Sequence, residues 1–172
     1  ATPGPRMHVT GPYISGDRAG GGMYAVATPE DARRVVAYWA GEGATWFKFY
    51  TLISREEMKA AIDEAHRLGL KLTGHLCSVG YREAVALGID ALEHGLFANA
   101  EYDASKQPDE CPATADASLA QVDIGGADVQ RTIADMVNNN VAMTSTLAIY
   151  ELYVPGRPPE LDPRMLEAMS EE

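Results

Sequence analysis

Short apolar segments alternate with amphipathic segments along most of this 172-residue chain, and this alternation limits the fold more than any other feature. Five apolar segments have the length of β-strands: residues 6–10, 45–51, 70–76, 89–94 and 141–147. Strands that alternate with helical patterns form parallel sheets, because two parallel neighbours must be joined by a crossover connection. The sequence therefore predicts an α/β fold with about five parallel strands.

The predicted helices begin at recognisable capping residues. Thr28 precedes a proline at the first helical position, and Ser54 is followed three residues later by Glu57, which is the pattern of a capping box. Further helices are predicted over residues 79–87 and 128–138 and from Asp162 and Pro163 onward. These helices fall between the predicted strands, as parallel crossovers require.

The length allows one domain over residues 1–172 with a substantial core. A complete (β/α)₈ barrel typically takes about 250 residues, so the chain is too short for one and fits an open sheet or a partial barrel. Residues 99–126 carry few helix or strand signals and are predicted to be an irregular insertion.

Charge and hydropathy exclude several kinds of partner. The formal net charge is −11 and no run of lysine or arginine occurs, which argues against nucleic acid or an anionic membrane surface. No apolar segment approaches the roughly 20 residues that span a bilayer. Cys77 and Cys111 form no CxxC motif, so they are either two free thiols or one bridge, and the compartment stays open.

Three chemically distinctive side chains occupy corresponding places in the predicted strands. Lys48 lies in the second strand, and His75 and His94 end the third and fourth. The carboxyl ends of parallel strands meet at one edge, and neighbouring strands lie about 4.8 Å apart, so these side chains can converge. Strand alternation places Lys48 and His75 on the face opposite the apolar residues, whereas Glu93 is expected to point outward.

A lysine among aromatic side chains is costly to bury as a cation, and burial favours its neutral, nucleophilic amine. Lys48 could then form a Schiff base, or it could react with carbon dioxide to give a carbamate that binds metals. The two histidines favour the second use, because neutral imidazole suits zinc and related divalent ions. The alternative is that all three are ordinary hydrogen-bonded residues of the core.

The same segments resemble motifs of the metal-dependent amidohydrolase superfamily, in the branch of imidazolonepropionase-like and Xaa-Pro dipeptidase-like enzymes. The resemblance covers nearly the whole chain and rests on strands 3 to 7 of the family barrel, which match, in order, GPRMHVTGPYIS, FKFYT, GHL, ALEHG and VAMTSTL. It implies a partial TIM-type (β/α) barrel of about five parallel strands.

The resemblance also implies a chemistry. The family site holds one or two divalent ions, usually zinc. Lys48 would be the carboxylated lysine that bridges two metals, and His75 and His94 would be ligands of the second metal. A metal-activated water would hydrolyse an amide, peptide or cyclic amide C–N bond. Tyr81 and Arg82, just beyond His75, are candidates for contacting a small amide or dipeptide-like substrate, and an exposed helix start is the alternative.

The chain also departs from the family pattern. It contains no HxH pair and no counterpart of the aspartate that ends the eighth strand, so we expect it to be catalytically incomplete by itself. A non-catalytic, barrel-derived binding or assembly domain is one alternative function, and a Schiff-base lyase that uses Lys48 is another. Unpaired strand edges in a partial barrel favour a homo-oligomer or pairing with another chain.

Overall fold

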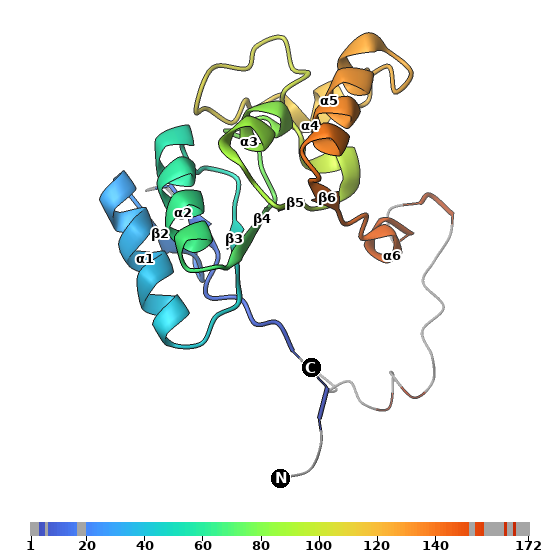
Figure 1. Ribbon diagram of the computed structural model, residues 1–172. Helices are drawn as coiled ribbons and strands as arrows, with labels where there is room; N and C mark the ends of the chain where they lie inside the picture. Colours follow the sequence, from blue (N-terminus) through green and yellow to red (C-terminus); the bar gives the residue numbers. More distant parts are fainter. Residues whose placement is uncertain are drawn as a thin grey trace.

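An arc of short parallel strands carries helices along one side (Figure 1). The computed structural model describes residues 4–5, 7–16, 20–151, 154–156, 164 and 167. The strands are β1 (Ile14–Ser15), β2 (Tyr24–Ala25), β3 (Trp46–Phe49), β4 (Lys71–Gly74), β5 (Ala91–Leu92) and β6 (Ala142–Met143). One parallel sheet has the order β2-β1-β3-β4 and a second pairs β5 with β6.

The two sheets continue into each other. The backbone N–H of Asp90 donates to the carbonyl of Leu72 (3.2 Å), and that of Glu93 donates to the carbonyl of Gly74 (2.9 Å). These bonds join β5 to β4, so the strands follow one another as in part of a barrel. The predicted α/β fold with parallel strands is confirmed.

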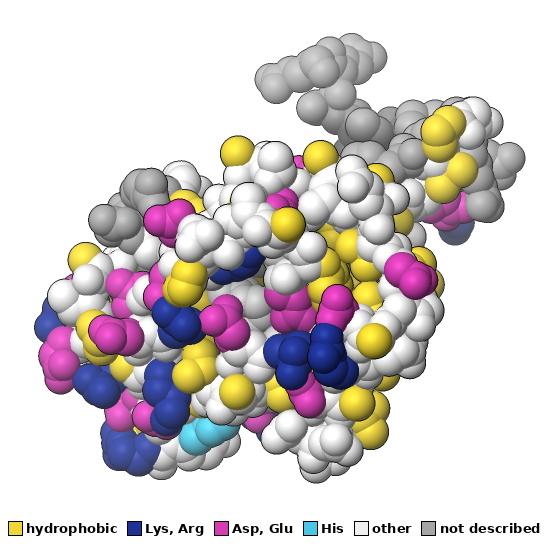
Figure 2. Space-filling model, turned by 90° about the horizontal axis from the view of Figure 1, so that it is seen from above, with side chains coloured by type: hydrophobic (Ala, Val, Ile, Leu, Met, Phe, Trp, Pro, Cys, Tyr) yellow, Lys and Arg dark blue, Asp and Glu magenta, His cyan; other side chains and the backbone are white. Residues whose placement is uncertain are grey.

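Helices α1, α2, α3 and α5 cover the outer side of this arc, and α6 lies on the other side (Figure 1). The α-helices are α1 (Pro29–Gly41), α2 (Arg55–Arg67), α3 (Tyr81–Leu87), α4 (Ala115–Leu119), α5 (Ala127–Asn138) and α6 (Leu147–Tyr150), and Gly95–Ala98 forms a 3₁₀ turn. None of the helices in the described ranges is long and apolar enough to cross a membrane. Acidic and basic side chains are interspersed over the face that Figure 2 shows.

The predicted caps are present. The Thr28 hydroxyl accepts a hydrogen bond from the backbone N–H of Asp31 (3.1 Å) at the start of α1. Ser54 and Glu57 form the reciprocal capping box of α2. Each cap satisfies backbone donors that the first helical turn leaves without partners.

The core lies between the strands and the helices, and the alternation of β3 decides which side chains enter it. Phe47 and Phe49 are fully buried against the helical layer, whereas Lys48 between them is only partly buried on the opposite face. Leu72 of β4 is also fully buried. Burial of each large apolar side chain contributes about 1.5–3 kcal/mol, so the helical side of the sheet carries most of the stabilisation.

The ends of the chain differ from the sequence prediction. The first strand does not span residues 6–10: Thr10 makes an isolated bridge to Trp46, and β1 begins only at Ile14. A proline at position 12 lacks the N–H that a continuous ladder needs, and this explains the interruption. Strand β2 was not predicted, and Leu147 begins α6 instead of ending a strand. The helix predicted from Asp162 and Pro163 lies outside the described residues.

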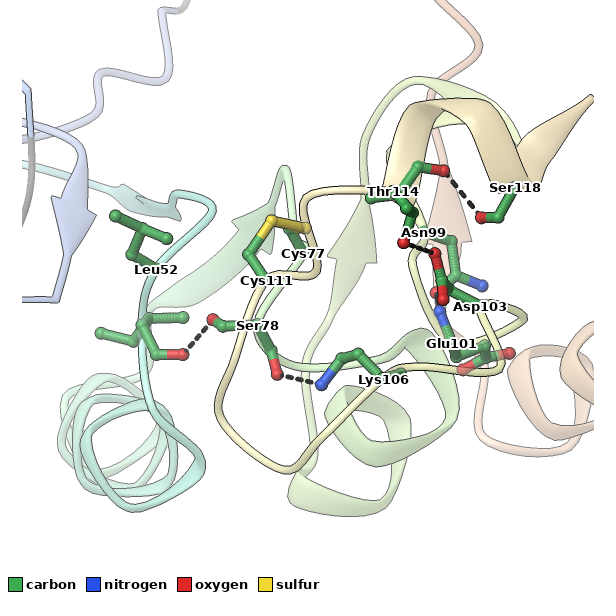
Figure 3. The surroundings of a disulfide bond; sticks show 12 residues. Leu52, Cys77, Ser78, Asn99, Glu101, Asp103, Lys106, Cys111, Thr114 and Ser118 are labelled. Carbon is green, nitrogen blue, oxygen red and sulfur yellow. Dashed lines mark hydrogen bonds between the residues drawn. A yellow bond between two sulfur atoms is a disulfide. The ribbon is translucent and has the colours of Figure 1, made fainter.

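Residues 99–126 contain one regular element, the short helix α4. A disulfide between Cys77 and Cys111 ties this insertion to the loop that follows β4, with a Cα–Cα distance of 5.0 Å (Figure 3). Of the two alternatives for the cysteines, free thiols or a bridge, the structure shows the bridge. Close by, the Lys106 ammonium donates to the carbonyl of Ser78 (2.6 Å).

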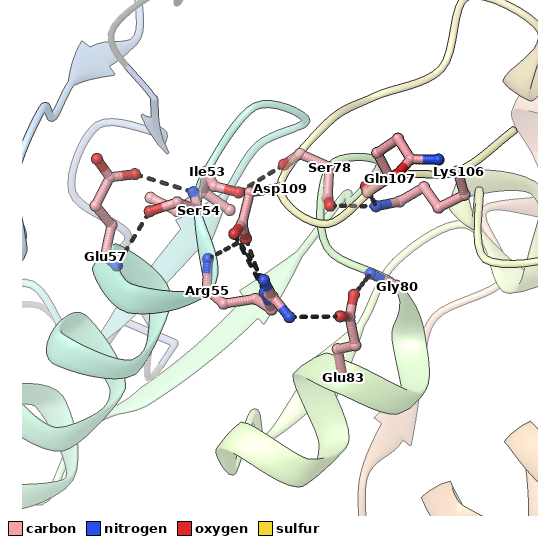
Figure 4. A network of polar contacts seen from close by, with 10 residues as sticks. All are labelled: Ile53, Ser54, Arg55, Glu57, Ser78, Gly80, Glu83, Lys106, Gln107 and Asp109. Atoms are coloured by element: carbon pink, nitrogen blue, oxygen red, sulfur yellow. Dashed lines mark hydrogen bonds and ion pairs between the residues drawn. The ribbon is translucent and has the colours of Figure 1, made fainter.

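A charged network provides a further anchor for the insertion. Asp109 accepts hydrogen bonds from the backbone N–H of Arg55 (2.8 Å) and from its guanidinium (3.0 Å), as Figure 4 shows. The same guanidinium reaches Glu83 at 3.3 Å, and Glu83 accepts a bond from the N–H of Gly80 (2.9 Å). The insertion is therefore attached to the starts of both α2 and α3.

Candidate functional site

Lys48, His75 and His94 line one cavity of about 660 Å³ on the side of the strands away from the helical layer. Each comes from a different strand or from the residues just after it, as the sequence predicts. The other lining residues are mostly aromatic or apolar: Tyr13, Tyr50, Phe97, Thr146, Ile149 and Tyr150. We call this space the strand-end pocket.

Aromatic rings form a continuous row along the strand-end pocket. Tyr13 stacks on Tyr50 (ring centroids 6.0 Å apart), Tyr50 contacts His75 (4.9 Å), and His75 meets His94 edge-on (4.6 Å). The Lys48 ammonium lies 5.0 Å from the centroid of the Tyr13 ring, within the range of a cation–π contact. The two histidines are thus neighbours, and the lysine stands beside the same row.

His94 owes its position to a tight turn. It has a left-handed conformation (φ 69°), as does Gly95 after it (φ 62°). The Tyr81 hydroxyl lies 2.8 Å from the carbonyls of both Glu93 and Gly95, and the Tyr150 hydroxyl donates to the carbonyl of His94 (3.0 Å). The turn that carries His94 is therefore fixed from two sides.

Tyr81 and Arg82, the two candidates for substrate contact, bond to other parts of the chain. Tyr81 is fully buried beneath the His94 turn, and burial raises its pKa. Arg82 pairs through its Nε with Asp135 of α5 (2.7 Å). Neither residue lines the strand-end pocket, so the structure gives both a scaffolding position. Residue spacing alone could not reveal this, because α3 turns Tyr81 inward and Arg82 toward α5.

Glu93 does not point outward as the strand alternation predicts. One of its carboxylate oxygens accepts a hydrogen bond from the hydroxyl of Thr73 (2.8 Å), and the other accepts one from Thr144. The predicted phase of the alternation was wrong: Leu92 of β5 is fully buried in the core, so Glu93 faces the opposite side, and the left-handed turn at His94 brings that histidine to the same side. Burial opposes ionisation of Glu93, but the bonds from Thr144 and Thr73 and the nearby charge of Lys48 lower its pKa. Sequence reasoning missed this residue, and its place beside a strand-end histidine is the signal that could have indicated it.

Both histidines are held in the neutral form. Burial, followed by the proximity of His94 and Lys48, lowers the pKa of His75 from 6.5 to about 4. Burial and the charge of Lys48 also lower the pKa of His94. Neutral imidazole is the form that binds metal ions, so at neutral pH both rings have a lone pair available.

The residues fit part of a metal site. Nδ1 of His94 lies 2.9 Å from the hydroxyl of Thr146, which fixes the ring and leaves Nε2 for a ligand. In the described part of the chain, no group of three or more His, Cys, Asp or Glu side chains could hold a metal ion. The nitrogen donors that line the strand-end pocket are the two imidazoles and the amine of Lys48.

Comparison with solved structures identifies the type of fold. A Xaa-Pro dipeptidase with methionine bound in its active site matches 92% of this chain with 17% identity and a TM-score of 0.57. The A. niger ochratoxinase matches 87% of the chain with 16% identity and a TM-score of 0.60. No protein-family model and no curated protein matches the sequence.

These matches define the fold and not the activity. The chain spans 40% of the dipeptidase structure and 37% of the ochratoxinase structure. The predicted architecture, a partial (β/α) barrel, is therefore confirmed. What the segment does must be argued from its own residues.

Proposed function

We propose that Lys48, His75 and His94 are metal ligands of an amidohydrolase-type hydrolase that cleaves amide, peptide or cyclic amide C–N bonds. The observation that carries this proposal is the meeting of the three side chains in the strand-end pocket, with the two imidazole rings 4.6 Å apart. A structural role explains it less well, because residues that only pack a core do not need two neutral imidazoles beside a lysine. We expect zinc, since imidazole nitrogen and carboxylate-like oxygen both suit it.

Each residue of the site has a role in this proposal. His75 and His94 offer neutral nitrogen donors, and Thr146 orients the second of them. Lys48 supplies an oxygen ligand once carbon dioxide has added to its amine. A bound metal would polarise the scissile carbonyl and lower the pKa of a water. The aromatic walls from Tyr13 to Tyr150 would bind apolar parts of the substrate and exclude bulk water.

Metal analysis of the purified chain tests the ligand assignment. We expect zinc to bind the wild type, and we expect Lys48→Ala and His94→Ala to weaken binding by at least about tenfold, since loss of even an outer-shell partner costs that much. Lys71→Ala and His66→Ala are matched controls, because these residues lie outside the strand-end pocket and should leave zinc affinity unchanged. Equal zinc affinity in all five proteins would refute the assignment. Covalent trapping of a carbonyl compound on Lys48 by borohydride would instead favour the Schiff-base lyase.

We infer further that this chain does not complete the reaction by itself. The sequence contains no HxH pair, which the family that it resembles uses for a further metal ion, so two imidazoles and a carboxylated Lys48 supply ligands for one ion at most. Hydrolysis of amide substrates by a homogeneous preparation of the 172-residue chain would contradict this inference.

Association with another copy or chain is also part of the proposal. Both residues of the edge strand β2, Tyr24 and Ala25, are exposed, and Ala142 of the opposite edge strand β6 is exposed as well. Unpaired strand edges offer backbone donors and acceptors to another strand. A strictly monomeric elution profile over a wide concentration range would contradict self-association.

A further inference from the structure

The Cys77–Cys111 bridge lies beside a residue of the candidate site. Both cysteines and His75 line a second cavity, of about 200 Å³, and His75 also lines the strand-end pocket. On one side of this second cavity lies the loop after β4, and on the other lies the segment 111–119 of the insertion, which we call the insertion wall. The bridge joins these two sides (Figure 3). A change at the bridge can therefore reach His75.

The insertion wall makes no hydrogen bond to the strands, or to any helix outside the insertion, in the part of the chain that the structure describes. The N–H of Ala115 donates to the carbonyl of Pro112 (3.1 Å), within the wall itself. The Thr114 hydroxyl donates to Asp103 (2.7 Å), which also belongs to the insertion. Among the described residues, the bridge is therefore the one bonded connection that holds this wall against His75.

The two sulfur atoms differ in their access to solvent. Cys77 is buried, with 8% of its surface exposed, whereas Cys111 is an exposed residue. A thiolate from solution therefore reaches Sγ of Cys111 more easily than Sγ of Cys77. Exposed disulfides are the ones that exchange readily with thiols, whereas structural disulfides resist reduction.

The loop after β4 has contacts that do not depend on the bridge. The N–H of Ser78 donates to the carbonyl of Thr51 (2.8 Å), and its hydroxyl donates to the carbonyl of Ile53 (2.5 Å). Both bonds lie next to Cys77, and neither involves the insertion. Opening the bridge would therefore free the insertion wall, whereas the loop that carries Cys77 would keep its place beside the end of β3.

We propose that the Cys77–Cys111 bridge is a thiol-exchange site, at which a small thiol frees the insertion wall and gives ligands access to His75. A thiolate attacks Sγ of Cys111, the bond between the two sulfur atoms breaks, and its electron pair leaves with Sγ of Cys77, which takes up a proton. A second thiolate then displaces Cys111, which becomes a thiol in turn, and the reductant leaves as its own disulfide. This inference goes beyond the proposed function, because it holds whether or not His75 binds zinc.

Reaction of the folded, metal-free chain with reduced glutathione tests the exchange. N-ethylmaleimide traps the free thiols, and peptide masses locate both groups. We expect glutathione on Cys111 and maleimide on Cys77 at least about tenfold more often than the reverse, because access decides which sulfur is attacked. The rate should be proportional to the glutathione concentration and unchanged in urea well below the unfolding transition. Attachment chiefly to Cys77, or reduction only where urea unfolds the chain, would overturn the proposal.

Modification by diethyl pyrocarbonate tests the access to His75. The reagent acylates neutral imidazole, and mass spectrometry reports each histidine separately. In the double variant Cys77→Ser, Cys111→Ser we expect His75 to react at least about threefold faster than in the bridged wild type, because local opening exposes the ring. His66, which lines neither cavity, should react equally in both proteins.

Arg55→Gln is the matched control. It removes the guanidinium that pairs with Asp109 but keeps the bridge, so His75 should react as in the wild type. If the double variant does not fold, wild-type protein reduced with a phosphine and then separated from it gives the same comparison. Equal rates at His75 with and without the bridge, or an equal increase in Arg55→Gln, would overturn the proposal. Loss of the zinc result would refute the proposed function and leave these rates unchanged.

Discussion

Replacing both Cys77 and Cys111 with serine is expected to destabilise the chain by about 2–4 kcal/mol. The bridge joins residues separated by 34 positions. With a closed loop of that length, the chain-entropy relation gives a loss of about 4 kcal/mol at 25 °C when the bridge is removed. Measured effects are commonly smaller, which sets the lower bound of the range.

The other anchors of the insertion limit how much the native state changes. Arg55 still pairs with Asp109, and Lys106 still donates to the carbonyl of Ser78. These contacts are partly exposed and contribute about 0.2–1 kcal/mol each, so they keep the insertion near its site but do not replace the bridge. The loss therefore arises mainly from the greater freedom of the unfolded chain.

Urea unfolding followed by circular dichroism measures the effect. With a slope of about 2 kcal/mol per molar, the midpoint should fall by about 1–2 M in the double variant. A reducing agent should produce a similar fall in the wild type and none in the double variant, which is the internal control. A loss below about 1 kcal/mol, or two titratable thiols in the unreduced wild type, would refute the reasoning.

Three further predictions concern the scaffold of the site. Tyr81→Phe removes the hydroxyl beneath the His94 turn and should cost about 1–3 kcal/mol in urea unfolding, because two partly buried carbonyls lose their donor; an unchanged midpoint would show that the turn is fixed by other contacts. Gly16→Ala should cost about 1–3 kcal/mol, since a Cβ there would overlap the backbone oxygen of Leu52, and a wild-type melting temperature would contradict this. The pKa of His75 is lowered from 6.5 to about 4, so the unfolded state binds more protons between these values and stability should fall as the pH drops from about 6.5 to about 4. The full shift would correspond to about 3 kcal/mol of unfolding free energy. Because the ring is partly exposed, we expect about 1–2 kcal/mol for His75 in the metal-free chain. An unfolding free energy that does not change over this pH range would disprove the prediction.

Several features of the fold could be read directly from local sequence. The caps at Thr28 and Ser54 depend on residues within one helical turn, so short-range pattern was enough to place the starts of α1 and α2. The alternation in β3 has an equally local cause, since successive side chains of a strand point to opposite faces. It correctly placed Lys48 on the face opposite Phe47 and Phe49.

The candidate site could be read only in part. The sequence placed Lys48, His75 and His94 at strand ends, because parallel strands bring their carboxyl ends to one edge. It did not indicate that Tyr13 and Tyr150 complete the walls of the strand-end pocket. Tyr13 and Tyr150 lie far from Lys48, His75 and His94 along the chain, and only the packing of β1 and α6 against the strand ends brings them there.

Sequence by itself therefore determined the parallel α/β architecture and the three residues that meet in the strand-end pocket. Only the tertiary structure decided the inward position of Glu93, the burial of Tyr81 and the pairing of the two cysteines. The physical reason is the range of the interactions. Caps and strand alternation act between residues close in the chain, whereas the His94 turn, the bridge and the placement of the insertion depend on contacts between segments tens of residues apart.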